Sequence, residues 1–274
     1  MDNIFQFIES GDEAKVRKLV EETAQGSKNI FSKRASIPKS PLTGVPVRLK
    51  SSLSAELMSY EATPLLWAAA FGRLTMIELF LAEGADINES QKLGLTALMY
   101  AASFGFLDVV HCLIKHGANI EAKDLRWGNT ALNYAAYNLC TDVTKALVTA
   151  GAAVDTPNKA GQSALRMVLK RYKESPETLE IAEVLLSAGA EVSDAEFLFS
   201  EERIVNNFST VLLCLHHGAI VNEEFFEMAR KVMAKEKETQ LREILHKEVR
   251  ISDLSTFLDC ILFRTHQLSH SQRF

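Results

Sequence analysis

A short sequence signal recurs along this chain at an almost constant interval, and this repetition restricts the fold more than any other feature. Four triplets begin with threonine or serine and end with leucine, and they start 33, 34 and 33 residues apart, at Thr63, Thr96, Thr130 and Ser163. Gly-Ala pairs form a second signal that keeps the same phase at Gly84, Gly117 and Gly151. Two signals in phase indicate an array of structural repeats, in which each unit buries its apolar surface against its neighbours.

Each repeat has the sequence features of two short helices. The hydroxyl at the start of each triplet can cap the N-terminus of a helix, and Pro64 suits a first helical turn. An Ala-Ala pair follows in the first three repeats, and Gly72 and Gly105 then mark a turn. The next segment is amphipathic, as over 109–114, and the Gly-Ala pair ends it. The sequence therefore predicts a repeated helix-turn-helix unit.

These units resemble the ankyrin repeat, which consists of a β-turn and two antiparallel helices in about 33 residues. Residues 94–120 are the most similar copy, and the resemblance is specific over 63–192. It implies an all-α ankyrin-repeat solenoid of stacked helix-turn-helix units with β-turn fingers and helical caps at both ends. The histidine that is frequent after the triplet in this family is replaced here, by Leu66, Met99, Asn133 and Arg166.

The repeat phase predicts four segments along the chain. They are a capping helix pair over 1–22, a basic insertion loop over 23–58, the ankyrin repeats over 59–222 and a C-terminal helical cap over 223–274. Four repeats are clear, and a fifth over 194–222 is degenerate. In the fourth repeat, residues 173–178 are expected to lengthen the turn between the two helices.

The insertion at 23–58 is the part of the chain that the repeats do not explain. It has no acidic residue before Glu56 and contains three of the six prolines. Three interpretations are open: a segment that binds an anionic membrane or nucleic acid, a linker controlled by phosphorylation of its serines, or a solvated insertion that folds back on the acidic array. The third is favoured because the positive charge is dilute. The residues that would carry anion binding are Lys33, Arg34, Lys39, Arg48 and Lys50.

The resemblance also implies where a partner protein would bind. In ankyrin arrays the turn tips and the exposed side of each first helix form one concave face, and aromatic and arginine side chains dominate binding hot spots. The predicted binding residues are Tyr60, Phe71, Leu93, Phe104, Arg126, Trp127, Tyr137, Asn138, Lys170 and Arg171, with Leu95, Asn129, Lys159 and Gln162 beside them. Phe104, Trp127 and Tyr137 are the expected anchors. The alternative is that Phe71 and Phe104 pack under a neighbouring turn or the insertion.

Motifs for catalysis, cofactor binding or metal binding are missing from the sequence. It has no glycine-rich phosphate loop, nucleophile elbow or metal-ligand spacing. The repeat phase places Cys112 and Cys214 at buried positions, His111 on the solvent side and His217 at a helix end. We therefore predict a protein that is not an enzyme and needs no cofactor.

Charge and cysteine spacing bear on partners and compartment. The chain has 30 basic and 35 acidic residues and a net charge of −5, so membrane or nucleic-acid binding is expected only through the insertion. The start lacks the regions of a secretory signal, and four cysteines without paired spacing favour a reducing compartment. We expect a cytoplasmic monomer that acts as a scaffold for a protein partner. The alternative is an effector or adaptor of an intracellular bacterium, secreted without a signal peptide to act on host proteins.

Overall fold

The computed structural model describes residues 4–24, 35–36, 61–170, 175–192 and 208–217. The chain forms two compact units, residues 1–168 and 169–274. The described part of the first unit contains an N-terminal helix pair, a short strand pair and the repeats up to the start of the fourth. The described part of the second unit contains the helices α11 and α13.

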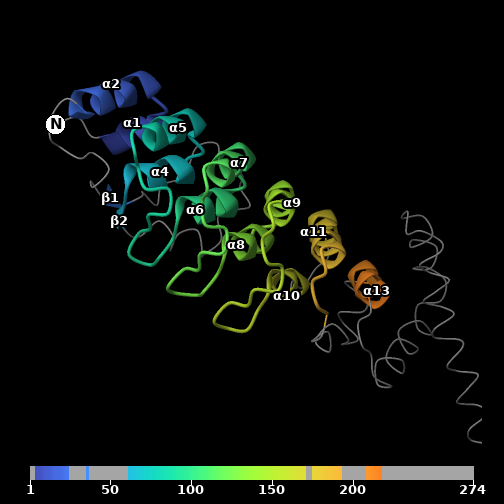
Figure 1. Ribbon diagram of the computed structural model, residues 1–274. Helices are drawn as coiled ribbons and strands as arrows, with labels where there is room; N and C mark the ends of the chain where they lie inside the picture. The colour runs from blue at the N-terminus through green and yellow to red at the C-terminus, as the bar shows by residue number, and fades with distance from the viewer. Residues whose placement is uncertain (1–3, 25–34, 37–60, 171–174, 193–207, 218–274) are drawn as a thin grey trace, which may run out of the picture. The chain divides into compact units, whose positions relative to one another are not determined.

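Each of the first three repeats supplies an inner helix and, after a tight turn, an outer helix, and the fourth repeat begins with an inner helix. The inner helices are α4 (Pro64–Ala70), α6 (Ala97–Phe104), α8 (Ala131–Tyr137) and α10 (Ala164–Leu169), whose last residue belongs to the second unit. The outer helices are α5 (Leu74–Ala82), α7 (Leu107–Lys115) and α9 (Thr141–Thr149). Helix α6 packs against α4 and α8, and α7 packs against α5 and α9. The inner and outer helices therefore form two layers, which Figure 1 shows as two rows.

Threonine caps begin the inner helices where the recurring triplets predicted them. The hydroxyls of Thr63, Thr96 and Thr130 each accept a hydrogen bond from the backbone N–H three residues later, at 3.3–3.5 Å. Asn133 completes a capping box, because its side-chain oxygen accepts from the Thr130 N–H at 3.2 Å. The Ser163 hydroxyl caps α10 in the same way. These bonds supply acceptors for N–H groups that a helix start leaves without partners.

The turn between inner and outer helix requires a residue in the left-handed conformation. Gly72 and Gly105 fill this place with φ of +66° and +75°. The next repeat packs directly on them, since a Cβ at Gly72 would lie 2.7 Å from a Phe106 ring carbon and one at Gly105 3.2 Å from Cys140 Sγ. In the third repeat Leu139 occupies the same place with φ of 58°. A non-glycine residue pays about 1–2 kcal/mol for this conformation.

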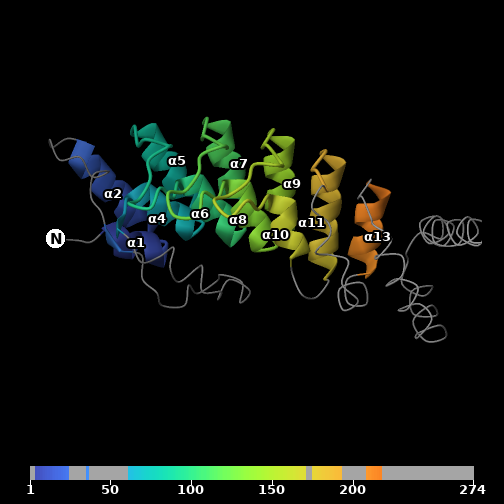
Figure 2. The same ribbon diagram turned by 90° about the horizontal axis from the view of Figure 1, so that it is seen from below.

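The N-terminal helices α1 (Ile4–Ser10) and α2 (Glu13–Ala24) cover the first repeat. Helix α1 packs against α4, and α2 packs against α5 (Figure 2). The Arg73 guanidinium, at the turn of the first repeat, donates to the backbone oxygens of Ile8 at 3.0 Å and Glu9 at 2.6 Å. The rings of Phe5 and Trp67 lie 5.0 Å apart. Hydrogen bonds and apolar contacts therefore both join this pair to the array.

A short strand pair is an addition that the sequence analysis did not predict. Strand β1 (Ala35–Ser36) pairs antiparallel with β2 (Glu61–Ala62), so that Ala35 lies opposite Ala62. Strand β2 ends next to the Thr63 cap, and the pairing therefore joins part of the insertion to the start of the first repeat. Apart from residues 23–24 and 35–36, the insertion lies outside the described residues.

In the second unit, helix α11 (Pro176–Ser187) packs against α13 (Phe208–His216). The predicted long turn over 173–178 is partly wrong, because α11 already begins at Pro176. Ser175 forms a capping box with Thr178, and proline suits the position after the cap. Helix α13 lies within residues 194–222, for which the sequence predicts a degenerate fifth repeat. The predicted cap over 223–274 lies outside the described residues.

Candidate functional site

Three β-turn fingers project from the helices of the first unit (Figure 1). Finger 1 comprises residues 91–95, finger 2 residues 124–129 and finger 3 residues 158–162. In each finger the N–H of the first residue donates to the carbonyl of the last, at 3.1, 3.0 and 3.0 Å respectively. The fingers are therefore closed turns with the same main-chain pattern.

Main-chain hydrogen bonds join each finger to the next. The Leu125 N–H of finger 2 donates to the Leu93 carbonyl of finger 1 at 2.7 Å, and the Lys159 N–H of finger 3 donates to the Trp127 carbonyl at 2.8 Å. Fingers 1 and 2 pack closely at Gly94, where φ is +79° and an added Cβ would lie 2.8 Å from Leu125 Cγ. The three fingers form one ladder that fixes their spacing.

A buried carboxylate organises finger 2. Asp124 is 3% exposed, and its Oδ1 accepts from the N–H groups of Arg126 at 2.8 Å and Trp127 at 2.6 Å. Its Oδ2 accepts from the Asn129 N–H at 2.7 Å and from the Tyr134 hydroxyl at 3.1 Å. Hydrogen bonds to a charged acceptor are about twice as strong as neutral ones. The four bonds therefore hold the finger in one conformation and tie it to α8.

The surroundings of Asp124 keep its tyrosine partner as a hydrogen-bond donor. Burial raises the pKa of Tyr134 well above its ordinary value, and the negative charge of Asp124 raises it further. Finger 3 joins the same cluster, since Asn158 Nδ2 donates to Asn129 Oδ1 at 3.0 Å. The base of finger 2 is therefore a satisfied polar network, which costs less to bury than unpaired groups.

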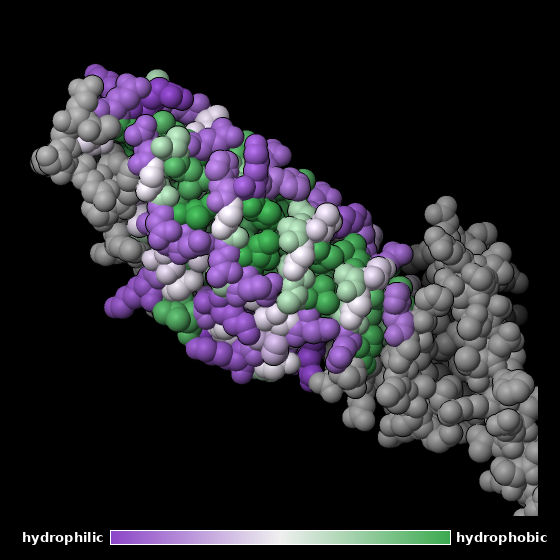
Figure 3. Space-filling view, in the orientation of Figure 1, coloured by the Kyte–Doolittle hydropathy of each residue, from purple (hydrophilic) through white to green (hydrophobic). Residues whose placement is uncertain are grey.

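Finger 2 exposes apolar surface at its tip. Leu125 is 65% exposed and Trp127 is 42% exposed, and within the described residues they are the large hydrophobic side chains with high exposure. Arg126 lies between them, with its guanidinium 4.9 Å from the centroid of the Trp127 ring. In Figure 3 the finger edge of the first unit is mainly hydrophilic, with a small hydrophobic patch among the tips. We call Leu125, Arg126 and Trp127 the finger-2 tip.

Comparison with protein-family models identifies the repeats. A model of three ankyrin repeat copies matches residues 48–124, and a single ankyrin repeat matches residues 127–159. The chain contains ankyrin repeats. Ankyrin repeats are generally protein–protein interaction modules. A search of curated protein sequences finds no significant match to this chain.

The inner helices of the ankyrin array offer less binding surface than predicted. The anchor Phe104 is 2% exposed, and its ring packs 6.2 Å from that of Phe106. Phe104 is buried because α6 lies between α4 and α8 and its last residue packs against Phe106 at the start of α7. The prediction that Phe104 lies on the binding face is therefore wrong. Leu95 and Asn129 are also buried, at 2% and 3% exposure.

Four other predicted residues are half-buried, namely Phe71, Leu93, Tyr137 and Asn138. Phe71 stacks on Trp67 with centroids 5.6 Å apart, and Asn138 Nδ2 donates to Ser103 Oγ at 3.0 Å. These contacts give both side chains a role in packing between or within repeats. Lys170 is exposed and belongs to the second unit. Tyr60, Arg171 and the five basic residues Lys33, Arg34, Lys39, Arg48 and Lys50 lie outside the described residues.

Leu125, the most exposed apolar side chain of finger 2, is a candidate that the sequence analysis missed. A signal for it existed, because Thr96 and Thr130 are 34 residues apart, whereas the intervals on either side are 33. The extra residue lies in finger 2, which spans 124–129, one residue more than each neighbouring finger. It lengthens the tip that carries Leu125, Arg126 and Trp127.

Cys112, Cys214 and His111 are placed as the repeat phase predicted, and the thiols of Cys112 and Cys140 show no sign of activation. Cys112 and Cys214 are buried and His111 is exposed. Burial raises the pKa of the Cys112 thiol, and it raises the pKa of Cys140 to about 11. A reactive thiol needs a lowered pKa. Within the described residues, no three metal-ligating side chains converge, and no helix has the length and apolar character to cross a membrane.

Proposed function

We propose that this ankyrin array binds a partner protein through its fingers, with the finger-2 tip as the central contact. The observation that carries the proposal is the exposure of Leu125 and Trp127 on one turn, with the Arg126 guanidinium over the Trp127 ring. Tryptophan and arginine are the residue types most enriched in binding hot spots.

The fold itself does not require apolar side chains at this tip. The ladder between fingers uses main-chain atoms of residues 93, 125, 127 and 159, and the base of finger 2 is held by Asp124. Polar residues at the tip would keep these bonds and would avoid exposing apolar surface to water. The stability of the fold therefore does not explain why Leu125 and Trp127 are apolar, whereas a partner that covers them would.

The finger-2 tip is also ordered before a partner arrives. Its two central N–H groups are fixed by Asp124, and its carbonyl at Trp127 is fixed by Lys159 of finger 3. A partner therefore need not order this loop on binding, and the entropy cost of association is smaller than for a flexible loop. The sequence prediction combined the turn tips with the exposed side of the inner helices, whereas the surface proposed here consists of the fingers.

A display library of protein fragments provides a direct test. Fragments selected on the intact chain are measured against the double variant Leu125→Ser/Trp127→Ala and against a control, His111→Ala/Lys115→Ala, whose residues are exposed on the outer helix α7. We expect selected fragments to lose about 30-fold in affinity on the finger variant, as loss of a hot-spot tryptophan implies. The control is expected to bind normally.

Both variants are first compared with the original chain by circular dichroism and thermal unfolding, so that lost binding reports contacts and not unfolding. Selected fragments that bind the finger variant as tightly as the original chain would refute the proposal. The bacterial-effector role and anion binding by the insertion are separate predictions, and the described residues provide no observation that favours either.

A further inference from the structure

The three fingers differ in charge from the chain as a whole. Each carries one exposed cation, which is Lys92 in finger 1, Arg126 in finger 2 and Lys159 in finger 3. The chain has a net charge of −5, yet Asp124 is the acidic residue within the three fingers, and its carboxylate is buried under four hydrogen bonds. The solvent side of the fingers is therefore positive, with the apolar residues of finger 2 in the middle.

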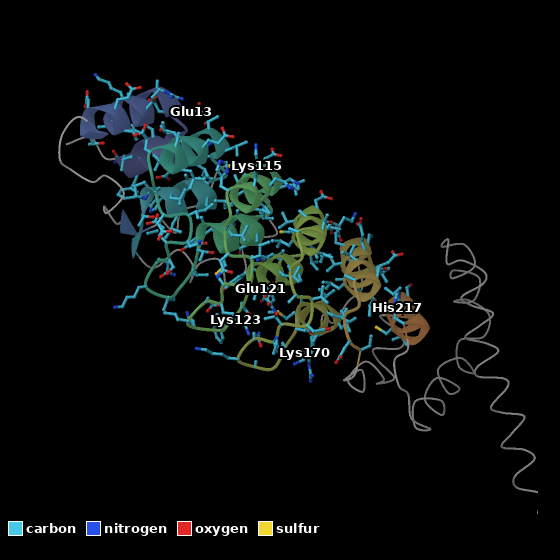
Figure 4. All side chains as sticks on the ribbon, viewed as in Figure 1. Glu13, Lys115, Glu121, Lys123, Lys170 and His217 are labelled. Atoms are coloured by element: carbon cyan, nitrogen blue, oxygen red, sulfur yellow. The ribbon has the colours of Figure 1, made fainter. Side chains whose placement is uncertain are left out.

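Lysines beside the fingers are held in place by neighbouring repeats. Lys159 Nζ donates to the Leu125 carbonyl, and Lys123 Nζ donates to the Pro157 carbonyl at 3.0 Å. Each ammonium has three donors, so both keep hydrogen-bonding capacity for a ligand. Glu121, the nearby acid labelled with Lys123 in Figure 4, instead accepts from the backbone of Ala153 at 2.8 Å. Lys123 and Lys159 are thus held along the finger edge, while Glu121 is bonded to the backbone of Ala153.

The spacing of the fingers sets the spacing of a matching ligand. Helices that pack side by side are about 8–10 Å apart, and fingers joined to successive helix pairs repeat at a similar distance. A chain in extended or polyproline II conformation advances about 3.1–3.4 Å per residue, so that about three residues span one finger. Side chains at every third position of a polyproline II segment also point the same way.

We infer that the partner presents an extended acidic segment, with an apolar side chain on the finger-2 tip and carboxylates about three residues before and after it. The apolar side chain would contact Leu125 and Trp127, while the carboxylates would pair with Lys92 and Lys159. This inference rests on the proposed function and adds the chemistry of the partner. Opposite charges at a rim contribute mainly to specificity and to the rate of association.

Trp127 provides a reporter for binding. The chain has two tryptophans, and Trp67 is 4% exposed while Trp127 is 42% exposed. A ligand on the finger-2 tip should therefore change the emission of Trp127 and leave that of Trp67 unchanged. The Trp127→Phe variant, which keeps an aromatic ring, identifies the source of the signal.

The experiment uses three synthetic peptides of equal length and the full chain. The first has leucine at its centre and glutamates three residues on either side, the second has glutamines in place of the glutamates, and the third has the glutamates moved next to the leucine. We expect the first peptide to shift Trp127 emission and to bind about tenfold more tightly than either of the others, as two exposed ion pairs allow. The difference should shrink as salt is raised.

Charge reversal locates the contact. Lys92→Glu should weaken binding of the first peptide by about fivefold, because it removes one of the two ion pairs, worth about threefold, and adds a repulsion between like charges. Lys115→Glu on α7 should leave the binding unchanged. Equal binding of the acidic and neutral peptides, or a lack of any emission change with all three, would overturn the inference. The display selection separates this failure from that of the proposed function: fragments that depend on Trp127 but carry no acidic residues keep the function and exclude the acidic partner.

Discussion

Replacing Asp124 with asparagine tests whether one buried carboxylate holds finger 2 together. The substitution keeps the size of the side chain and one oxygen, which can still accept from the Arg126 and Trp127 N–H groups. The other oxygen becomes an amide nitrogen. In the original chain this oxygen accepts from the Asn129 N–H at 2.7 Å, and in the variant that N–H faces a second donor. The Asn129 N–H loses its partner in a site where Asp124 itself is 3% exposed.

The expected loss of stability follows from these contacts. A buried N–H without an acceptor costs about 1–3 kcal/mol, and each of the two remaining bonds weakens by about 1 kcal/mol when the acceptor loses its charge. Part of this is offset because a neutral side chain is cheaper to bury. We expect the free energy of unfolding of the first unit to fall by about 2–4 kcal/mol. Tyr134→Phe removes only the bond at 3.1 Å and should cost about 1–2 kcal/mol.

Urea unfolding followed by Trp127 fluorescence measures both variants, because the indole lies on the finger that Asp124 organises. Circular dichroism at 222 nm reports the helices in the same samples. A loss below about 0.5 kcal/mol for Asp124→Asn, within the range of ordinary surface substitutions, would show that the hydrogen bonds seen at finger 2 do not stabilise it.

Three further predictions concern the turns, the N-terminal helices and the thiols. Gly105→Ala should lower the free energy of unfolding by about 1–2 kcal/mol. Leu139→Gly at the equivalent turn should change it by less than about 1 kcal/mol, because relief of the left-handed conformation offsets the lost packing of the leucine side chain. Equal losses for the two variants in urea unfolding would contradict this prediction. Arg73→Ala removes two hydrogen bonds to the carbonyls of α1, and the backbone amides of α1 and α2 should then exchange about tenfold faster or more. Hydrogen exchange measures this, with Lys18→Ala as the control. An unchanged exchange rate would show that Arg73 does not hold the helix pair. Cys140, with a pKa of about 11, should be alkylated by iodoacetamide at pH 8 about a hundredfold more slowly than in the unfolded chain, and a peptide map showing equal rates would refute its protected state.

The sequence predicts the helices of the array well because their signals are local. The caps at Thr63, Thr96 and Thr130 and the turns at Gly72 and Gly105 each follow from the chemistry of one residue and its neighbours. A hydroxyl satisfies helix N–H groups and a glycine accepts positive φ, wherever the rest of the chain lies. The repeat period then places these local elements in order.

Exposure at the candidate site was harder to predict because it depends on packing between repeats. Phe71 and Phe104 occupy the same position in the repeat, yet one is half-buried and the other is 2% exposed. The repeat period alone assigns both phenylalanines to the same face of the array. Trp127 and Arg126 were placed correctly at the surface, since the tip of a turn has few neighbours. The pairing of β1 with β2 was also missed, because Ala35 and Ala62 meet across a long segment with no repeat signal.

The bonds that join one finger to the next have a consequence for how such a protein changes over time. They connect the N–H of Leu125 to the carbonyl of Leu93 and the N–H of Lys159 to the carbonyl of Trp127, and almost every amino acid can supply these two groups. The side chains above them are consequently replaceable without dismantling the support beneath. An array built in this way can acquire a new binding preference through a few substitutions at its turns, while the inherited framework stays intact.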